Sequence, residues 1–348
     1  MFNGKTLPYV VFGMVVVGVC SFVGNQFKQY FTDMDTRDDY QLVKKYMLDE
    51  SALYGDNRPK LWVHTKYETN SRKWKNFHSR NTTDLNQPYL YITVQSMINH
   101  CGDDFHVCLI DDETFSRLIP TWTIDLSTTP EPMRSYYRDI AMLQLIYRYG
   151  GIVVPNSFLC TRSLKPLYEE AVSYKVPFVF EKRKQQSFTG NKPFVPNVRM
   201  IGAVKEDPKI QELIAFMTSQ HTHGHFSAQT AFLGTIEEWC STEVDTHAIT
   251  LVDGNLIGIK TEIGKPILLD DLMSDGFLDI PHDDVLYGIL IPSDELLKRP
   301  KYQWFSILPY EDAMQAKTIL SKYMQASMVD SVRSFYDQKK QTTSMISI

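Results

Sequence analysis

Short apolar runs alternate with amphipathic stretches through the middle of this 348-residue chain. Runs at 61–64 and 105–110 predict buried strands, and apolar residues spaced three and four apart between them predict a helix after Pro88. Strand, helix and strand in this order begin a parallel sheet with right-handed crossovers. The pattern therefore predicts an α/β fold, with a mostly parallel central sheet flanked by helices. Further helices are expected at 113–118, 134–149, 208–218, 227–240 and 310–336, and further strands at 152–154, 178–181, 198–203, 256–259, 267–269 and 286–291.

The most informative of these segments is the long helix 134–149, which ends at a glycine pair and passes directly into the strand 152–154. In open α/β sheets, ligands bind just outside the carboxyl ends of the strands. Residues 155–157, which are Pro, Asn and Ser, come at that place. We therefore expect the binding chemistry of the chain to lie near them.

This segment resembles the sugar transferases of glycosyltransferase family 32, a group with a DXD sugar-binding motif that includes capsular-polysaccharide-type proteins. Their motif has an aspartate in a helix that ends in Tyr-Gly-Gly, followed by a strand that closes in Asp-X-Asp. Asp139, Tyr149 and the glycine pair fall in register with it, and residues 59–64 are similar to the family's first strand. The two segments span about 59–166. The resemblance implies a GT-A-like single domain that transfers a sugar from a nucleotide-sugar donor to a glycan or protein acceptor.

Three positions depart from the family pattern. Met142 stands where the family usually has an arginine, and Pro155 and Ser157 stand where it has the two aspartates. Those carboxylates hold Mn or Mg, which neutralises the donor diphosphate. Two interpretations therefore stay open. One is a divergent transferase, with or without Mn or Mg; the other is a catalytically inactive scaffold that serves as a structural or binding protein, for instance in a viral envelope or capsid.

The resemblance implies donor contacts at several positions along the two matched segments. These positions are His64, Asp139, Gly150, Gly151, Asn156 and Ser157. Asp111 and Asp112 follow a predicted strand and could supply substitute acidic contacts, or they could cap the helix that begins at 113. Asp139, near the start of its helix, could also be stabilised by the helix dipole alone.

Two other clusters are candidates for chemistry. His221, His223 and His225 alternate along the chain and could bind a transition metal, or they could simply be solvated in a polar loop. The paired acids at 270–271 and 283–284 could supply the base that an inverting transferase needs, although nothing in their spacing selects them from other acids.

The N-terminal segment 7–23 is apolar or small throughout and carries no charge. Its length is near the lower limit for a membrane-spanning helix, about 20 residues, and it also fits a secretory signal core. No small-x-small cleavage site follows it, so we expect a single-pass anchor. The predicted organisation is an anchor at 1–27, a polar stem at 28–57, the GT-A-like domain at 58–325 and a polar tail at 326–348. The globular domain would then face a secretory-pathway lumen or belong to a viral envelope or internal membrane.

Net charge, a glycosylation triplet and the cysteines bear on the partners and the cellular compartment of the protein. A net charge of -5 and a pI near 6.0 argue against a nucleic-acid partner, because such proteins concentrate Lys and Arg against phosphates. Asn81 begins an N-glycosylation triplet, which matters only in a lumen. Of the five cysteines, Cys20 lies in the apolar segment, which leaves four that could pair or remain thiols.

Overall fold

The computed structural model describes a large part of the chain beyond the stem. It describes residues 58–65, 87–184, 193–223, 229–281 and 285–328, with only the backbone at 221–223 and 229–233. The chain divides into two compact units, 1–45 and 46–348, and every described residue belongs to the second. The expected anchor and stem, Asn81, His225 and the acids at 283–284 lie outside the described residues. Within them, no helix has the length and apolar character needed to cross a membrane.

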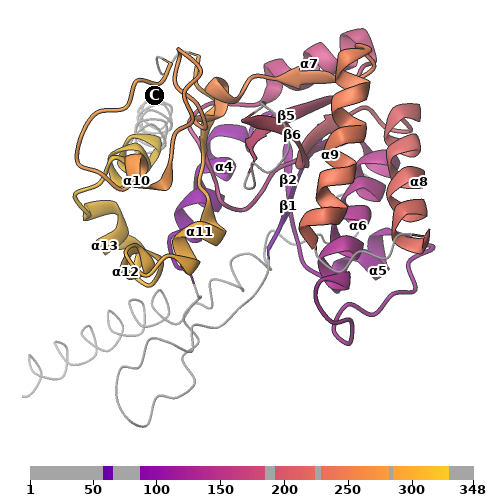
Figure 1. Ribbon diagram of the computed structural model, residues 1–348, viewed down its shortest axis with the longest axis horizontal. Coiled ribbons are helices and arrows are strands. Elements are labelled where there is room, and N and C mark those ends of the chain that lie inside the picture. Colours follow the sequence, from indigo (N-terminus) through magenta and orange to yellow (C-terminus); the bar gives the residue numbers. More distant parts are fainter. Residues whose placement is uncertain (1–57, 66–86, 185–192, 224–228, 282–284, 329–348) are drawn as a thin grey trace, which may run out of the picture. The chain divides into compact units, whose positions relative to one another are not determined.

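Six of the described strands form one sheet, in the order β2-β1-β3-β6-β5-β7 (Figure 1). Their bounds are β1 Lys60–His64, β2 His106–Ile110, β3 Gly151–Val153, β5 Phe178–Arg183, β6 Phe194–Ala203 and β7 Thr250–Val252. β1 pairs in parallel with both β2 and β3, and β5 pairs in parallel with β7. Only β6 is antiparallel to its neighbours β3 and β5. The predicted α/β class with a mostly parallel central sheet is therefore confirmed.

Helices cover both faces of this sheet. They are α4 Leu90–Cys101, α5 Thr114–Leu118, α6 Met133–Tyr149, α7 Lys165–Tyr174, α8 Pro208–His223, α9 Gln229–Asp245, α10 Leu269–Leu272, α11 Ser293–Lys298, α12 Gln303–Ser306 and α13 Tyr310–Gln315. Figure 1 shows α5, α6, α8 and α9 on one side of the sheet, and α4 with α10 to α13 on the other. A second, two-stranded sheet pairs β4 Phe158–Cys160 with β8 Gly288–Leu290.

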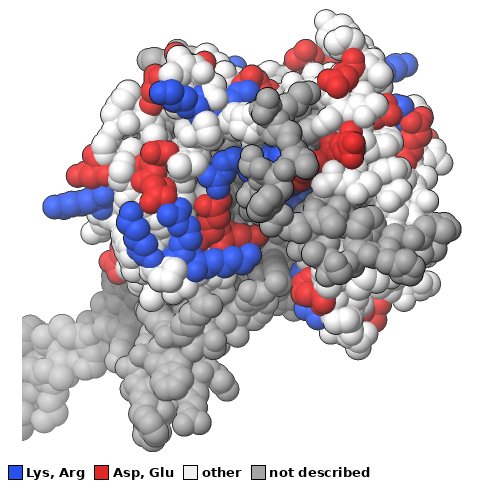
Figure 2. Space-filling view, viewed as in Figure 1, with Lys and Arg blue, Asp and Glu red and all other residues white. Residues whose placement is uncertain are grey.

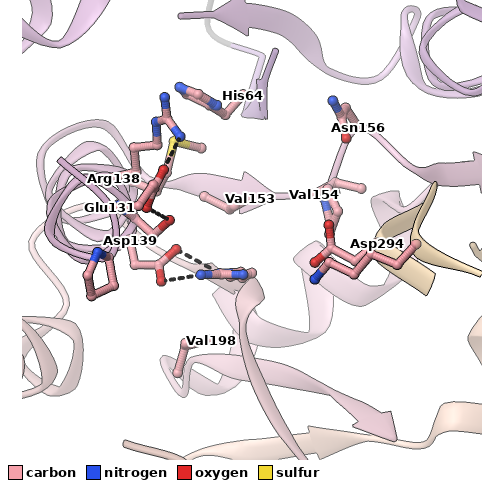
Figure 3. A pocket seen from close by; sticks show the side chains of 15 residues that line it. His64, Glu131, Arg138, Asp139, Val153, Val154, Asn156, Val198 and Asp294 are labelled. Carbon is pink, nitrogen blue, oxygen red and sulfur yellow. Dashed lines mark hydrogen bonds and ion pairs between the residues drawn. The ribbon is translucent and has the colours of Figure 1, made fainter. Parts of the chain in front are cut away.

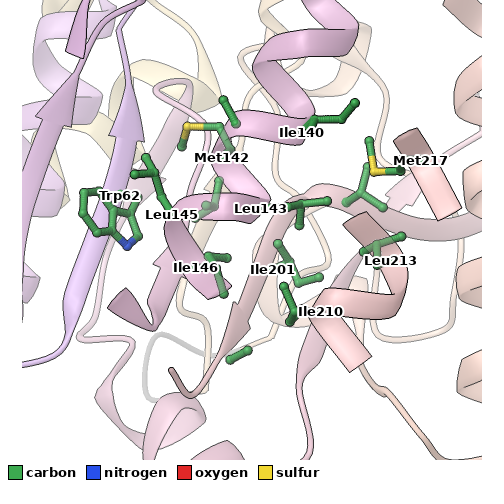
Figure 4. Close-up of a cluster of buried hydrophobic side chains, with 14 of the residues drawn as sticks. Trp62, Ile140, Met142, Leu143, Leu145, Ile146, Ile201, Ile210, Leu213 and Met217 are labelled. Carbon is green, nitrogen blue, oxygen red and sulfur yellow. The ribbon is translucent and has the colours of Figure 1, made fainter. Parts of the chain in front are cut away.

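The larger hydrophobic core lies between the sheet and the helices α5, α6, α8 and α9. From α6, Leu143 and Ile146 are buried against Ile201 of β6 and against α8, as Figure 4 shows. Each such side chain contributes about 1.5–3 kcal/mol by leaving water. A separate cluster joins α4 to β4, β8 and the C-terminal helices. The two cores fix α6 and α11 on either side of the strand ends, which is where the cavity described below opens.

Glycine lets the chain turn from α6 straight into β3. Gly150 and Gly151 have φ angles of +70° and +105°, conformations that side-chain-bearing residues rarely adopt. A Cβ on Gly151 would lie 2.1 Å from the carbonyl oxygen of Lys60 in the neighbouring strand. The Trp62 indole Nε1 also donates to the Gly150 carbonyl at 2.9 Å. The predicted helix, turn and strand are present, and the glycines allow β3 to approach β1.

The C-terminal half departs from the predicted elements in several places, and β7, α11 and α12 were not predicted. The first two residues of the strand expected at 256–259 belong to a 3-10 helix, Gly254–Ile257, which is capped by the Asp253 side chain, and the other two lie in the turn that follows. No strand forms at 267–269, and the last of these residues, Leu269, begins α10. The long helix expected at 310–336 is interrupted at 316–318, where Ala316 is extended.

Candidate functional site

A cavity of about 460 Å³ opens at the carboxyl ends of β1 and β3 (Figure 3). His64, the last residue of β1, and residues 153–156, at and beyond the end of β3, form part of its wall. The amino-terminal half of α6 contributes Arg138 and Asp139, β6 contributes Arg199, and α11 contributes the remaining side. The cavity therefore lies at the sheet edge where the sequence predicts binding chemistry.

The Asp139 carboxylate and the Arg199 guanidinium form a bidentate salt bridge on the wall of this cavity. Arg199 donates from Nε and from Nη2 to the two carboxylate oxygens, both at 2.8 Å. Asp139 is only 9% exposed, whereas the Arg199 side chain is 41% exposed. The Asp139 charge raises the pKa of Arg199 further, so the guanidinium stays a cation. Parallel hydrogen bonds of this kind hold both groups in a fixed orientation.

A second charged group involves His64, Asp112 and Arg138. Arg138 donates from Nε to Asp112 at 2.7 Å and from Nη2 to the second carboxylate oxygen. The same carboxylate lies 3.0 Å from Nε2 of His64. Burial alone would raise the pKa of Asp112, but Arg138 and His64 outweigh it and hold that pKa well below its usual range. The His64 ring stacks on Phe115, with 5.5 Å between the ring centroids and 8° between the planes.

Asp111 and Asp112, which the sequence leaves as alternatives between capping and binding, take different places. Asp111 accepts hydrogen bonds from the backbone N–H groups of Glu113 and Thr114 at 3.1 and 3.0 Å, and from the Thr114 hydroxyl at 2.6 Å. It caps the start of α5. Asp112 instead pairs with two residues that line the cavity.

Asn156 and Ser157 also lie in different surroundings, one on the cavity wall and the other buried outside it. Asn156 lines the cavity, and its carbonyl accepts a hydrogen bond from the Thr93 hydroxyl of α4 at 2.5 Å. Ser157 is 5% exposed and is not part of the cavity wall; its carbonyl accepts from the backbone N–H of Ile291. Of the two residues, only Asn156 is placed to meet a ligand in this cavity.

Gly150 and Gly151, for which the resemblance implies donor contacts, do not line this cavity. Both residues lie at the amino end of β3, opposite to the cavity, and neither is part of the cavity wall. A Cβ on Gly150 would meet the backbone of Lys205 at 2.9 Å, as Gly151 would meet Lys60. The glycines allow close backbone packing, and they act on the cavity only by positioning β3.

The other candidate residues lie elsewhere or outside the described side chains. For His221 and His223, at the end of α8, only the backbone is described. Asp270 binds Arg299 at 2.7 Å and the Tyr302 hydroxyl at 2.5 Å, away from the cavity wall. Throughout the described ranges, no group of three or more His, Cys, Asp or Glu side chains could hold a metal ion. The four cysteines within those ranges are free and buried.

The residues around the strand end do not fit a carboxylate-bound Mn or Mg. Pro155 has no side-chain ligand atom, Asn156 offers one amide oxygen, and Ser157 is buried. Asp139, the buried carboxylate of the wall, already accepts two hydrogen bonds from Arg199. Mn and Mg are held in proteins mainly by carboxylate oxygens. The cavity wall therefore lacks the ligand set that the DXD motif supplies.

If His64 is left aside, the cavity wall carries equal numbers of acidic and basic side chains. The acidic residues are Glu131, Asp139 and Asp294, and the basic residues are Arg138, Arg199 and Lys298. Figure 2 shows Lys and Arg side chains gathered next to carboxylates over α11 and the segment that follows it. The sequence did not single out five of the charged residues that line the cavity: Arg138, Arg199, Glu131, Asp294 and Lys298. Of these, only Arg138 could have been suspected from the sequence, because it directly precedes Asp139.

No protein-family model matches the chain. A search of curated proteins likewise finds no match. Among solved structures, the chain is similar to one described as "PaToxG Glycosyltransferase", at 10% sequence identity, covering 64% of this chain and 83% of that chain, with a TM-score of 0.32. A TM-score of this size establishes neither a common fold nor a common activity.

Proposed function

We propose that the protein is a GT-A-like sugar transferase, related to the DXD-motif transferases of family 32, that binds the glycosyl group of a nucleotide-sugar donor in this cavity. The observation that carries the proposal is the pair formed by Asp139 and Arg199 at the carboxyl end of the sheet. Sugar hydroxyls both donate and accept hydrogen bonds. A guanidinium has five N–H donors and a carboxylate about four acceptor positions, so a pair that uses two of each still offers both kinds of partner.

The balance of charges supports an uncharged glycosyl group as the ligand within the cavity. Both arginines of the wall are already paired with carboxylates, so neither presents an uncompensated charge. An acidic sugar beside these two pairs would bring a further negative charge that neither arginine is free to compensate. Lys298 is exposed at the end of α11 and has no ion-pair partner within the described residues. We assign Lys298 to the donor diphosphate at the rim of the cavity.

Calorimetry of the full-length protein with a panel of nucleotide sugars, each with and without Mn, tests this proposal. We expect one donor with an uncharged sugar to bind, and Mn to change its affinity little. Asn156→Ala should weaken that binding, because the amide is the polar side chain that follows β3 on the cavity wall. Asn99→Ala is the matched control, since Asn99 bonds to Gln95 on α4 away from the cavity. Absence of binding by every donor would refute the proposal.

The inactive scaffold is the second candidate, and one observation favours it. Pro155 and the buried Ser157 leave a single polar side chain, Asn156, at the strand end where the family has its acidic motif. A structural or binding role in an envelope or virion would require the fold without turnover. Binding of a donor without release of the nucleoside diphosphate over long incubation would favour this candidate over a transferase.

We further propose that the segment 7–23 anchors the protein in a membrane, with the globular domain in a secretory-pathway lumen or within a viral envelope or internal membrane. The proposal rests on the length of the uncharged run. Resistance of the full-length protein to alkaline extraction from membranes tests the anchor. Sensitivity of its gel mobility to an N-glycosidase, lost in Asn81→Gln, tests the lumenal side.

A further inference from the structure

Two of the buried cysteines, Cys101 and Cys160, are in contact with each other. Their Sγ atoms lie 3.7 Å apart, although the residues are 59 positions apart in the sequence. We propose that Cys101 and Cys160 form a disulfide when the folding domain meets a disulfide oxidant such as glutathione disulfide, and that this bond fixes α4 to β4. The inference goes beyond the proposed function and does not depend on whether the protein transfers a sugar.

The backbone around the two cysteines is already held together on either side of the pair. Cys101 is the last residue of α4, and Cys160 is the last residue of β4. Earlier in α4, the Ser96 hydroxyl accepts a hydrogen bond from the Cys160 backbone N–H at 2.9 Å. Beyond the pair, Asp104 accepts one from the Ser163 hydroxyl at 2.6 Å. Bringing the sulfur atoms from 3.7 Å to a bond length of about 2.05 Å therefore needs a movement of side chains rather than a new approach of the backbone.

The other two described cysteines have different surroundings. Cys108 and Cys240 belong to the larger hydrophobic core, among aliphatic and aromatic side chains. Packing explains them, because a buried cysteine behaves as a small apolar residue. Among the four cysteines that the structure describes, only Cys101 and Cys160 have sulfur atoms in contact with each other. Their position therefore indicates a cross-link rather than packing alone.

The proposed step is thiol–disulfide exchange during folding. Both side chains are fully buried in the folded protein, so the exchange occurs before α4 covers β4. One cysteine thiolate attacks a sulfur of the oxidant; the bond between the oxidant sulfurs breaks, and its electron pair leaves with the second sulfur, which takes a proton. The other cysteine thiolate then attacks the mixed disulfide and releases the first oxidant sulfur. In total the two cysteines lose two electrons and two protons, which the oxidant gains as two thiols.

The cross-link would join α4 to the segment 156–160 at both ends of the helix. Near its start, the Thr93 hydroxyl already donates to the carbonyl of Asn156 on the cavity wall. At its last residue, the disulfide would close a loop between positions 59 apart, and bonds across long loops restrict the unfolded chain most. Disulfides persist in oxidising compartments such as a secretory lumen and are rare in the cytosol. The bond is therefore expected in the lumen proposed for this domain.

Mass spectrometry of the refolded full-length protein tests the bond itself. The protein is unfolded in urea with a reductant, returned to native buffer with oxidised and reduced glutathione, alkylated in urea and digested without reductant. We expect one pair of peptides linked through Cys101 and Cys160, and Cys20, Cys108 and Cys240 recovered as alkylated thiols. Recovery of Cys101 and Cys160 as thiols, or their linkage to other cysteines, would overturn the proposal.

Thermal denaturation separates the disulfide from the packing of the side chains. Each protein is refolded once with glutathione disulfide and once with a reductant, so the cost of a substitution cancels. The oxidised wild type should melt roughly 5–15 °C above the reduced form, the usual gain from a disulfide. The buried control Cys108→Ala should keep this difference and Cys160→Ala should lose it, with Cys101→Ala as the second variant if Cys160→Ala does not fold. A wild-type Tm that ignores the redox state, or a difference that persists without Cys160 or Cys101, would rule out the bond and leave donor binding untouched.

Discussion

Replacing Gly151 with alanine tests whether the glycine pair serves the backbone or a ligand. The new Cβ would lie 2.1 Å from the Lys60 carbonyl oxygen, and the residue would have to keep a φ of +105°. Strained φ values cost about 1–3 kcal/mol, and forcing a methyl group into a packed region costs about 1–3 kcal/mol more. The sum, about 2–6 kcal/mol, is a large share of the 5–15 kcal/mol that stabilises a typical domain. We expect Gly151→Ala to lower the urea midpoint strongly.

Two other glycines provide matched controls for this experiment. Gly264 has a φ of +80°, and nothing lies within 4 Å of a Cβ built there, so Gly264→Ala measures backbone strain without a clash. Gly234 lies in α9 with open space around it and an ordinary φ, so its replacement should stabilise the protein by about 0.5–1 kcal/mol. The excess loss in Gly151→Ala over Gly264→Ala then reports the contact with Lys60. A Gly151→Ala protein of unchanged stability that no longer binds a donor would refute the structural role.

Three further predictions follow from charged and thiol groups. Asp139→Asn should lower the free energy of unfolding by about 1–2 kcal/mol, because it weakens the pair with Arg199. This value lies between those expected for a fully buried and a fully exposed ion pair. Thermal denaturation measures the loss. The pKa of Asp112 is lower in the folded protein than in the unfolded chain, where it is about 3.9, so the ionised carboxylate stabilises the fold above that pH. This stabilisation is lost as the pH falls through the folded-state pKa. The difference in stability between the wild type and Asp112→Asn should therefore shrink on acidification. Burial raises the pKa of Cys108 and of Cys240 to about 12, so a thiol reagent at pH 8 should label neither before urea unfolds the protein.

Local periodicity was sufficient to predict the elements that build the centre of the sheet. The strands β1 and β2 and the helix α6 were expected within one or two residues of their bounds, because their apolar positions repeat at clear intervals. The error at 256–259 has a local cause: glycines at 254 and 258 and the cap from Asp253 favour a tight helical turn over a strand. The short strand β4, Phe158–Cys160, was not predicted.

The chemistry of the cavity depends on residues that are far apart in the sequence. His64 and Asp112 are 48 residues apart, and Asp139 and Arg199 are 60 residues apart. No spacing rule links such pairs, because the order of the strands alone brings them together. The sequence pointed to two residues that line the cavity, Asp139 and Asn156, from a helix, a turn and a strand. It could not show that each aspartate is paired with an arginine, which decides the charge of the cavity.

The pairing of charges bears on whether the cavity is a damaged site or a working one. A site that had merely lost two aspartates, and with them its cation, would leave arginines positioned for a metal-bound diphosphate without partners. Here Arg138 and Arg199 are each held by a carboxylate through two hydrogen bonds, without any ligand. Such pairs cost desolvation energy and add little net stability, so packing alone does not account for them. Together with His64, which is hydrogen-bonded to Asp112, they form a preorganised set of hydrogen-bonding groups, as the proposed function requires.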